Sequence, residues 1–458
     1  MVFSLLCLII YSIFTGRQGT LQALIATVFL MFTLKTFGVK KLLALSMSIT
    51  WSAIPTPGFI SKFSGPILID ANFFEVAIFL AFSVLMFLFL LRQKETKTSP
   101  YWPFFALFAV FGLIGFLSGY GSDRLLAWRQ FRQTCVAPFA LYVLITQFLD
   151  NNEDAKRAAT YLLAGGFLIC LLPITGFREV PADSLALQEL LDERLSGSYD
   201  LGLLGRLSIN LNSGSFLLGL FVVLGLCVFL GNCSKKIKLL AGLVVSLGTA
   251  GIVGMATRGT WFSLVLVIPM VFLLSKKYGN FKIKKPFIIA MIALGASAII
   301  VIKGNIISKE VESRWNSVLS IESLTTEDKN YLGRMQVNKE AFQLWQENPL
   351  GTGFVSLGSR ISDVIHSLYF DYLLGTGLAG VVVFIILMSL LFKYYLKALR
   401  VAGQEDAWLL ISAMASIALM MIFGLSGTLS RRFYVNITFW TIVSLGVVAA
   451  RSVLAKQD

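Results

Sequence analysis

Apolar runs of about 20 residues follow one another along almost the whole length of this 458-residue chain. A helix of that length crosses the hydrocarbon core of a bilayer, which is about 30 Å thick. Lipid offers the backbone no hydrogen bonds, so only helices and closed β-barrels span it. The strands of a barrel alternate apolar and polar residues, and these runs do not. We therefore predict an all-α fold, a polytopic integral membrane helical bundle that forms a single membrane domain over 1–458.

The amino-acid composition agrees with lipid as the solvent. Hydrophobic residues make up 56% of the chain and charged residues only 14%, whereas soluble domains carry about 25% charged residues. The net charge of +14 is then an orientation signal in the membrane rather than a sign of nucleic-acid binding. The cysteines lie in or beside apolar runs without metal-ligand spacing, and we interpret them as small hydrophobic residues.

The apolar runs predict about 12–14 transmembrane helices. The first run lacks a basic leading segment and a small-residue cleavage site, so we interpret it as an uncleaved helix rather than a signal peptide. The predicted helices are 2–15, 20–36, 40–56, 72–92, 102–119, 131–149, 157–176, 209–231, 237–256, 259–275, 286–302, 367–393, 407–424 and 434–452.

The lysine-rich loops all fall on one side of the membrane when these helices are threaded in order. The positive-inside rule assigns that side, and both termini with it, to the cytoplasm. Two longer loops, 177–208 and 303–366, then lie on the outward, periplasmic face. Each contains the pattern of an amphipathic helix, over 187–195 in the first loop and over 337–345 in the second, where Pro349 is expected to end the helix.

Arginine collects on the outward face, against the same rule. The arginines that lie inside are only Arg92, Arg157, Arg400 and Arg451. A guanidinium group is a planar fork that pairs with two phosphate oxygens and keeps its charge at every physiological pH. We therefore expect the outward arginines, among them Arg124, Arg129 and Arg132 before the sixth helix, to recognise a phosphate or diphosphate at the outer leaflet.

Two residues are candidates for a site on this face. Arg258 occupies the short turn between two predicted helices, where a charge at bilayer depth costs about 3 kcal/mol or more unless it lines a polar cavity. Its alternative is to extend to the lipid headgroups. His366, the single histidine, lies where the second long loop re-enters the membrane, and an imidazole can act as a base near neutral pH. Position alone also allows a purely structural histidine, and Asp371 nearby either orients a partner or pairs with an arginine.

Four short stretches resemble the O-antigen ligase and O-antigen polymerase superfamily. His366-Ser367, nine residues and then Gly377 are similar to the family signature of histidine, a small polar residue, a nine-residue gap and glycine. Residues 257–261 (Thr-Arg-Gly-Thr-Trp) resemble the family's Ser/Thr-Arg-Gly-x-Trp turn, and residues 348–354 resemble its Asn-Pro-Leu-x-Gly-x-Gly element. Arg334 matches an arginine upstream of that element. The resemblance covers about 200–450 of the chain.

The resemblance implies a membrane-embedded glycosyltransferase of the bacterial inner membrane, with its site facing the periplasm. Such enzymes move a glycan from an undecaprenyl-diphosphate carrier to an acceptor hydroxyl, with no nucleotide or metal cofactor. By this resemblance His366 is the general base, while Arg258, Arg206 and Arg334 bind the diphosphate and stabilise it as the leaving group. The implied partners are the lipid-linked glycan donor, a lipid A–core or glycan acceptor, and the lipid bilayer.

Three functions remain open on the sequence. An O-antigen ligase joins the glycan to lipid A–core, and we favour this broader family label. A polymerase uses the same kind of site to join one lipid-linked repeat unit to another. A flippase for lipid-linked oligosaccharides belongs to a different class, and would place its charges along a central path between two related halves. The sequence shows instead two unlike halves with the informative residues at one face.

Overall fold

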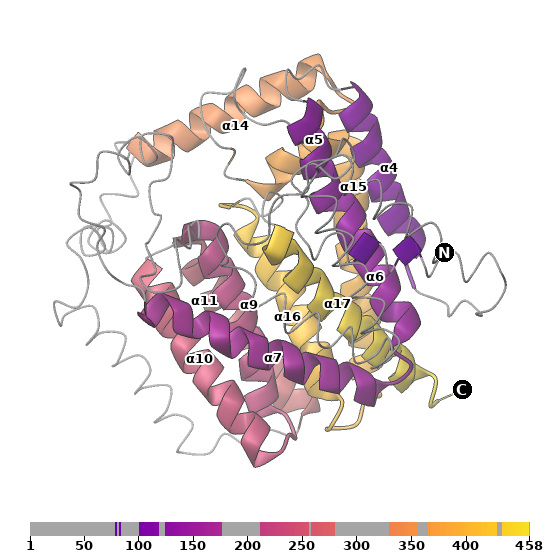
Figure 1. Ribbon diagram of the computed structural model, residues 1–458, viewed down its shortest axis with the longest axis vertical. Coiled ribbons are helices and arrows are strands. Elements are labelled where there is room, and N and C mark those ends of the chain that lie inside the picture. Colours follow the sequence, from indigo (N-terminus) through magenta and orange to yellow (C-terminus); the bar gives the residue numbers. More distant parts are fainter. Residues whose placement is uncertain are drawn as a thin grey trace, which may run out of the picture.

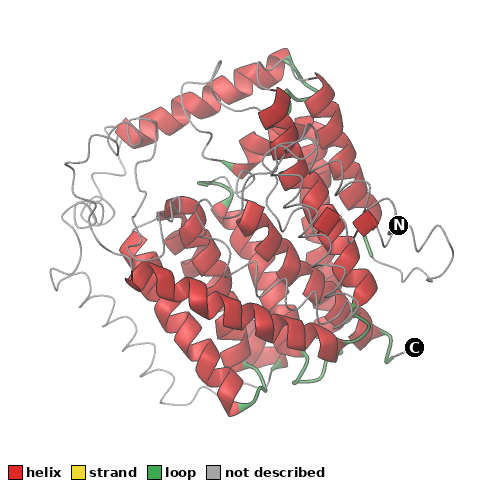
Figure 2. Ribbon diagram, viewed as in Figure 1, coloured by secondary structure: helices red, strands yellow, loops and turns green. Residues whose placement is uncertain are grey.

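A computed structural model gives the structure of the chain, and every regular element that it describes is a helix or a helical turn (Figure 2). The predicted all-α class is therefore confirmed. The residues that the structure describes are 78–79, 82–83, 100–118, 124–175, 211–255, 258–279, 329–354, 365, 367–427 and 433–457. The predicted helices 2–15, 20–36, 40–56 and 286–302, most of 72–92 and the loop 177–208 lie outside these residues.

Figure 1 shows the helices of the first half of the chain. They are α4 (Trp102–Ser118), α5 (Arg124–Phe131), the π-helical turn η1 (Arg132–Val136), α6 (Ala137–Phe148) and α7 (Asn152–Thr175). The helices of the second half are α9 (Leu211–Leu230), α10 (Lys235–Met255), α11 (Arg258–Tyr278), α14 (Lys329–Glu347), α15 (Leu368–Leu399), α16 (Ala407–Phe423) and α17 (Phe433–Leu454).

Most predicted helices lie where apolar runs placed them, and the differences occur at polar ends. α7 begins at Asn152 instead of 157, because the Asn151 side-chain oxygen accepts a hydrogen bond from the Asp154 N–H (2.8 Å) and caps the helix. α15 continues to Leu399 instead of 393, since a helix does not have to end where its apolar run leaves the lipid. The predicted amphipathic helix in the second long loop is confirmed as α14, which ends before Pro349.

Arg124, Arg129 and Arg132 precede α6, as the sequence predicted, but the helical backbone already begins at Arg124. Arg124 and Arg129 belong to α5, and Arg132 begins η1, which continues directly into α6. Apolar runs locate only the part of a helix that lies in lipid, so they miss a polar start. The stretch 124–137 contains no glycine or proline that would interrupt a helix.

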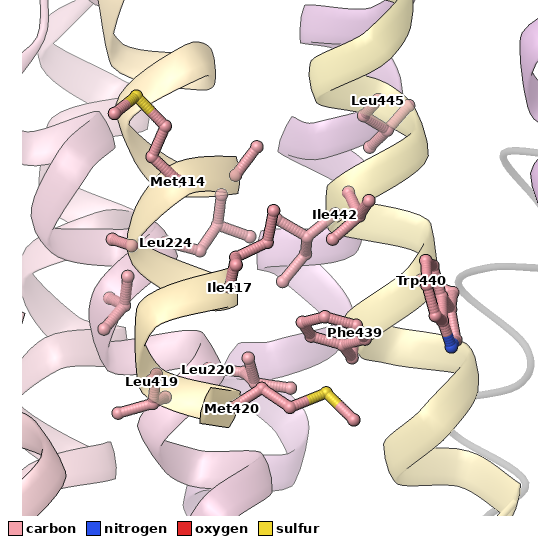
Figure 3. Packing of buried hydrophobic residues seen from close by; sticks show 14 of the residues in the cluster. Leu220, Leu224, Met414, Ile417, Leu419, Met420, Phe439, Trp440, Ile442 and Leu445 are labelled. Atoms are coloured by element: carbon pink, nitrogen blue, oxygen red, sulfur yellow. The ribbon is translucent and has the colours of Figure 1, made fainter. Parts of the chain in front are cut away.

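α16 and α17 form the centre of the bundle, packed against α9 (Figure 3). In an 18-residue apolar stretch of α17, 83% of the residues are buried inside the protein, whereas in the corresponding stretch of α11 the share is 33%. Because lipid tails are as apolar as leucine, close van der Waals packing holds such helices together rather than the escape from water. Gly446 of α17 allows this closeness, since a Cβ there would collide with the Cβ of Ala413. The labelled core residues are Leu220, Leu224, Met414, Ile417, Leu419, Met420, Phe439, Trp440, Ile442 and Leu445.

The outer surface of the bundle is apolar as well. Large hydrophobic side chains remain exposed on α11, with Val265 62% and Leu273 69% accessible, and on α4, where Leu117 is 71% accessible. Soluble proteins rarely expose such contiguous apolar faces, and lipid covers them at no cost. In the described residues, three helices are long and apolar enough to cross a membrane, namely α11 from Gly259, α15, and α17 from Val435.

One end of the bundle gathers the basic loops. Lys156 at the start of α7 forms an ion pair with Asp406 before α16 (2.6 Å) and with Glu153 (2.9 Å). Desolvation lowers the pKa of Lys156, but the hydrogen bonds and charges of these carboxylates outweigh it, so that the pKa is raised. Arg451 near the end of α17 donates hydrogen bonds to the carbonyls of Thr146 (2.9 Å) and Leu149 (3.0 Å) at the end of α6. The start of α7 is thus joined to the loop before α16, and the end of α6 to the end of α17.

The opposite end is built on a break in α15. Gly377 adopts φ 67° and ψ 179° inside this helix, a conformation that is open to glycine and strained for other residues. The loop that follows α14 fills the break: the Thr352 N–H donates to the Leu374 carbonyl (2.7 Å), and the Ser118 hydroxyl of α4 donates to the Gly351 carbonyl (2.8 Å). These bonds supply partners for irregular backbone within the bundle.

Glycines allow three segments to cross here at backbone contact: α4, the loop after α14 and the break in α15. We call this meeting point the glycine crossing. A Cβ on Gly351, where φ is 94°, would lie 2.8 Å from both the Gly377 nitrogen and the Leu374 oxygen, and a Cβ on Gly377 would lie 2.8 Å from the Pro349 oxygen. A Cβ on Gly115 of α4 would collide with the Gly375 carbonyl. The obstacles are backbone atoms, which cannot rotate away.

Replacement of Gly351 by alanine is therefore expected to lower stability by about 2 kcal/mol or more, because it adds both a clash and a strained φ angle. The matched control is Gly403→Ala in the loop before α16, where a Cβ would meet no atom within 4 Å. Thermal unfolding of the detergent-purified protein measures both. Equal melting temperatures for the two variants would contradict the proposed crossing.

Candidate functional site

The turn at the end of α16, residues 423–427, anchors the start of α15. The Leu368 N–H donates to the Gly424 carbonyl (2.9 Å) and to the Gly427 carbonyl (3.1 Å). The Ser367 hydroxyl also donates to the Gly424 carbonyl (3.2 Å) and is buried. Ser367 and Leu368, the two residues that follow His366, are thus fixed to this turn by three hydrogen bonds.

The same turn contacts the start of α11. A Cβ on Gly259 would lie 2.5 Å from the Ser426 hydroxyl oxygen and 3.4 Å from the Phe423 ring. Close approach of this kind requires glycine, and it places the chain position directly after Arg258 against the turn. The predicted sites Arg258 and His366, more than a hundred residues apart in the sequence, therefore each adjoin a residue that contacts 423–427.

α11 is further fixed to α9 by the residues of its Thr-Arg-Gly-Thr-Trp stretch. The hydroxyls of Thr260 and Ser215 are hydrogen-bonded (2.7 Å), and both side chains are fully buried. The Ser263 hydroxyl donates to the Gly259 carbonyl (2.7 Å) in the next turn of the helix. Thr260 and Gly259 thus hold the first turn of α11 in place. Arg258 is the first residue of this turn.

The N-terminal half of α15, Leu368 to Thr376, lies between this turn and the glycine crossing. The Tyr369 hydroxyl donates to the Met421 carbonyl (2.7 Å) of α16. Asp371 is 2% exposed, and its N–H donates to the Ser367 carbonyl (3.0 Å) in the first turn of the helix. The half-helix is therefore held at both ends and along one side, which fixes the backbone that flanks His366.

α14 crosses the same end of the bundle (Figure 1). Its buried residues Val337 and Ala341 pack against Ile365 and Leu374, in a small cluster separate from the main core. Ile365 directly precedes His366. The amphipathic face predicted for this helix thus contacts the chain beside the histidine and does not face solvent.

The four residues proposed from the sequence fall in different parts of this picture. Arg258 is the first residue of α11, and Arg334 lies in the first half of α14. Arg206 and the imidazole of His366 lie outside the described residues, although Ile365 and Ser367 on either side of the histidine are described and buried.

One of the outward arginines named from the sequence lies in a buried polar group. Arg132, Gln133 and Thr134 of η1 are all buried, with Arg132 2% exposed. π-helical turns inside α-helices occur frequently at functional sites, and charged groups within a membrane bundle face its polar interior. Arg132 therefore joins the candidates on its burial. The sequence grouped it with the other outward arginines, and only its packed position distinguishes it.

Residues 243–385 match a family model described as O-antigen ligase. This segment of the chain is similar to O-antigen ligases. The resemblance to the O-antigen ligase and polymerase superfamily is thereby confirmed, and the matched segment runs from α10 through the break in α15. It indicates a membrane protein with glycosyltransferase-type activity on lipid-linked glycans. No curated protein matches the chain.

The contact between Gly259 and Ser426 can be tested by a double-mutant cycle. Gly259→Ala is expected to destabilise the protein, because its new methyl group needs the space of the Ser426 hydroxyl. Ser426→Gly in the same chain is expected to restore part of the loss, with a coupling of about 0.5 kcal/mol or more between contacting residues. Thermal unfolding of the four proteins measures the coupling. Strictly additive effects would show that α11 does not contact the turn.

Proposed function

We propose that this protein transfers a glycan from an undecaprenyl-diphosphate carrier to an acceptor hydroxyl at the periplasmic face of the bacterial inner membrane. The acceptor in this proposal is lipid A–core, which makes the protein an O-antigen ligase. The observation that carries the proposal is the approach of two chain positions to one turn: the residues after Arg258 and after His366 both contact 423–427. Arg258, Arg334, His366 and Gly377 all lie in the segment that matches the O-antigen ligase family.

The proposed reaction is a displacement at the anomeric carbon. His366 accepts the proton of the acceptor hydroxyl, whose oxygen forms the new bond to the anomeric carbon. The bond from that carbon to the diphosphate oxygen breaks, and undecaprenyl diphosphate leaves with the electron pair. Attack from the face opposite the diphosphate inverts the anomeric centre. No nucleotide or metal takes part in this scheme.

The arginines act on the leaving group. Negative charge grows on the departing diphosphate, and fixed cationic donors in a site of low dielectric constant stabilise it most at that stage. In this proposal Arg258, Arg206 and Arg334 provide these donors. The hydrogen bonds and the close glycine contact at 423–427 support it, because a preorganised group does not have to be reoriented during the reaction.

Replacement of His366 by alanine is expected to reduce transfer by about 10²- to 10⁴-fold, the usual contribution of a positioned base. Arg258→Lys is expected to reduce it by about tenfold or more, because a point charge cannot bind two oxygens as a guanidinium does. The matched control is Arg400→Lys, an exposed arginine at the opposite, basic end of the bundle. The measurement is transfer from lipid-linked donor extracted from the host membrane. Full activity of His366→Ala at normal expression would remove the histidine as base.

Deletion of the gene separates the ligase from its alternatives. Loss of a ligase leaves lipid A–core without long glycans while lipid-linked polymer accumulates. Loss of a polymerase, the second candidate within the same superfamily, leaves lipid A–core with a single repeat unit. Loss of a flippase leaves the lipid-linked donor on the cytoplasmic side. Gel analysis of surface glycans, together with quantification of lipid-linked intermediates on each side, reads out the three patterns, and unchanged glycans would contradict the proposed function.

A further inference from the structure

One flank of α14 carries an amide and two aromatic rings at helical spacing. Asn338, Phe342 and Trp345 lie four and three residues apart, so they share one side of the helix. This amide–aromatic flank borders the buried face, because Trp345 also packs against the cluster of Val337 and Ala341. The flank therefore lies next to the face that contacts the residue before His366.

The two rings form a rigid pair that remains accessible. Phe342 is 42% exposed, and its ring centroid lies 5.4 Å from that of Trp345 at an interplanar angle of 42°. The Trp345 indole N–H donates to the Pro349 carbonyl (3.2 Å), which fixes the orientation of the indole. The rings thus present a fixed aromatic surface with its polar atom already bonded.

The amide on this flank has an unused acceptor. The side-chain oxygen of Asn338 is shielded from solvent and accepts no hydrogen bond from the described residues. A buried polar atom without a partner costs about 1–3 kcal/mol, so a hydroxyl donor from a ligand would be favourable there.

The charges of the second half of α14, which carries the flank, disfavour a membrane surface as the occupant. Helices that lie on anionic lipid are rich in lysine and arginine on their polar face. The stretch 336–347 carries only Lys339 against Glu340 and Glu347. Its remaining polar positions are amides, namely Gln336, Asn338, Gln343 and Gln346. Neutral amides and aromatic faces suit an uncharged ligand with many hydroxyl groups.

We propose that the amide–aromatic flank of α14 binds a sugar ring of the glycan during transfer. The C–H groups on the apolar face of a pyranose carry partial positive charge and are attracted to the negative face of an aromatic ring. The ring hydroxyls donate to the Asn338 oxygen. This inference rests on the proposed function, and it makes Phe342 and Trp345 determinants of glycan recognition at a distance from the diphosphate.

Competition assays test the flank separately from the diphosphate site. The probes are the free oligosaccharide, released by mild acid from the extracted lipid-linked donor, inorganic pyrophosphate and undecaprenyl phosphate. Phe342→Ala and Trp345→Ala are expected to weaken inhibition by the free oligosaccharide by about tenfold, in line with the loss of an aromatic contact. Inhibition by pyrophosphate is expected to remain unchanged in both variants.

Two further variants control for structure. Trp345→Phe keeps a ring and the packing against Val337, and is expected to recover most of the oligosaccharide inhibition. Gln343→Ala lies on the exposed, opposite side of α14 and is expected to behave as the unmodified protein. Because the Phe342 ring is 42% exposed, its removal leaves the core intact, and the melting temperature of this variant checks that.

Three outcomes are distinguishable. Unchanged oligosaccharide inhibition in Phe342→Ala and Trp345→Ala would overturn the inference. The proposed function would still stand in that case, provided that the unmodified protein carries out the transfer. Weaker inhibition by undecaprenyl phosphate, with oligosaccharide inhibition unchanged, would assign the flank to the lipid chain and also overturn it. Absence of transfer by the unmodified protein from any lipid-linked donor would remove the proposed function itself.

Discussion

Backbone that leaves the regular helix inside a bilayer has to find its hydrogen-bond partners in the protein itself, and this constraint organises the end of the bundle where the candidate site lies. α15 breaks at Gly377, and the loop after α14 enters the break with its own irregular backbone. The Leu374 carbonyl and the Ser118 hydroxyl supply the missing partners. Backbone contact therefore explains why residues 351 and 377 are both glycines.

The turn at 423–427 depends on the same logic and relates two distant parts of the chain. Its carbonyls accept hydrogen bonds from Ser367 and Leu368, while its Ser426 side chain contacts Gly259. The first turns of α15 and α11 are consequently held on one support. For a reaction that relies on preorganised charge beside a base, a shared support of this kind matters more than the strength of any one hydrogen bond.

α14 adds a second layer over this end of the bundle. Its apolar face packs against Ile365 and Leu374, which is why this amphipathic helix has a fixed position. The amide–aromatic flank beside that face provides a neutral surface, whereas the proposed diphosphate site is cationic. Separate surfaces for the sugar and for the diphosphate would let one enzyme bind a long glycan without weakening its hold on the leaving group.

The sequence by itself determined the solvent and the class of fold. Apolar runs, the lack of alternation and the stop at Pro349 are local features, and local features decide which segments become helices. The motif spacing also indicated the resemblance to O-antigen ligases, which the family match supports over residues 243–385. Other properties depended on contacts between distant segments: the break in α15, the burial of Arg132, and the turn at 423–427 that both Gly259 and Ser367 contact. Gly424 and Ser426 belong to no motif, so their part in the site became visible only when α11, α15 and α16 were packed together. Helix formation satisfies hydrogen bonds within one segment, whereas the relative position of two helices is decided by side-chain and backbone contacts that no local pattern encodes.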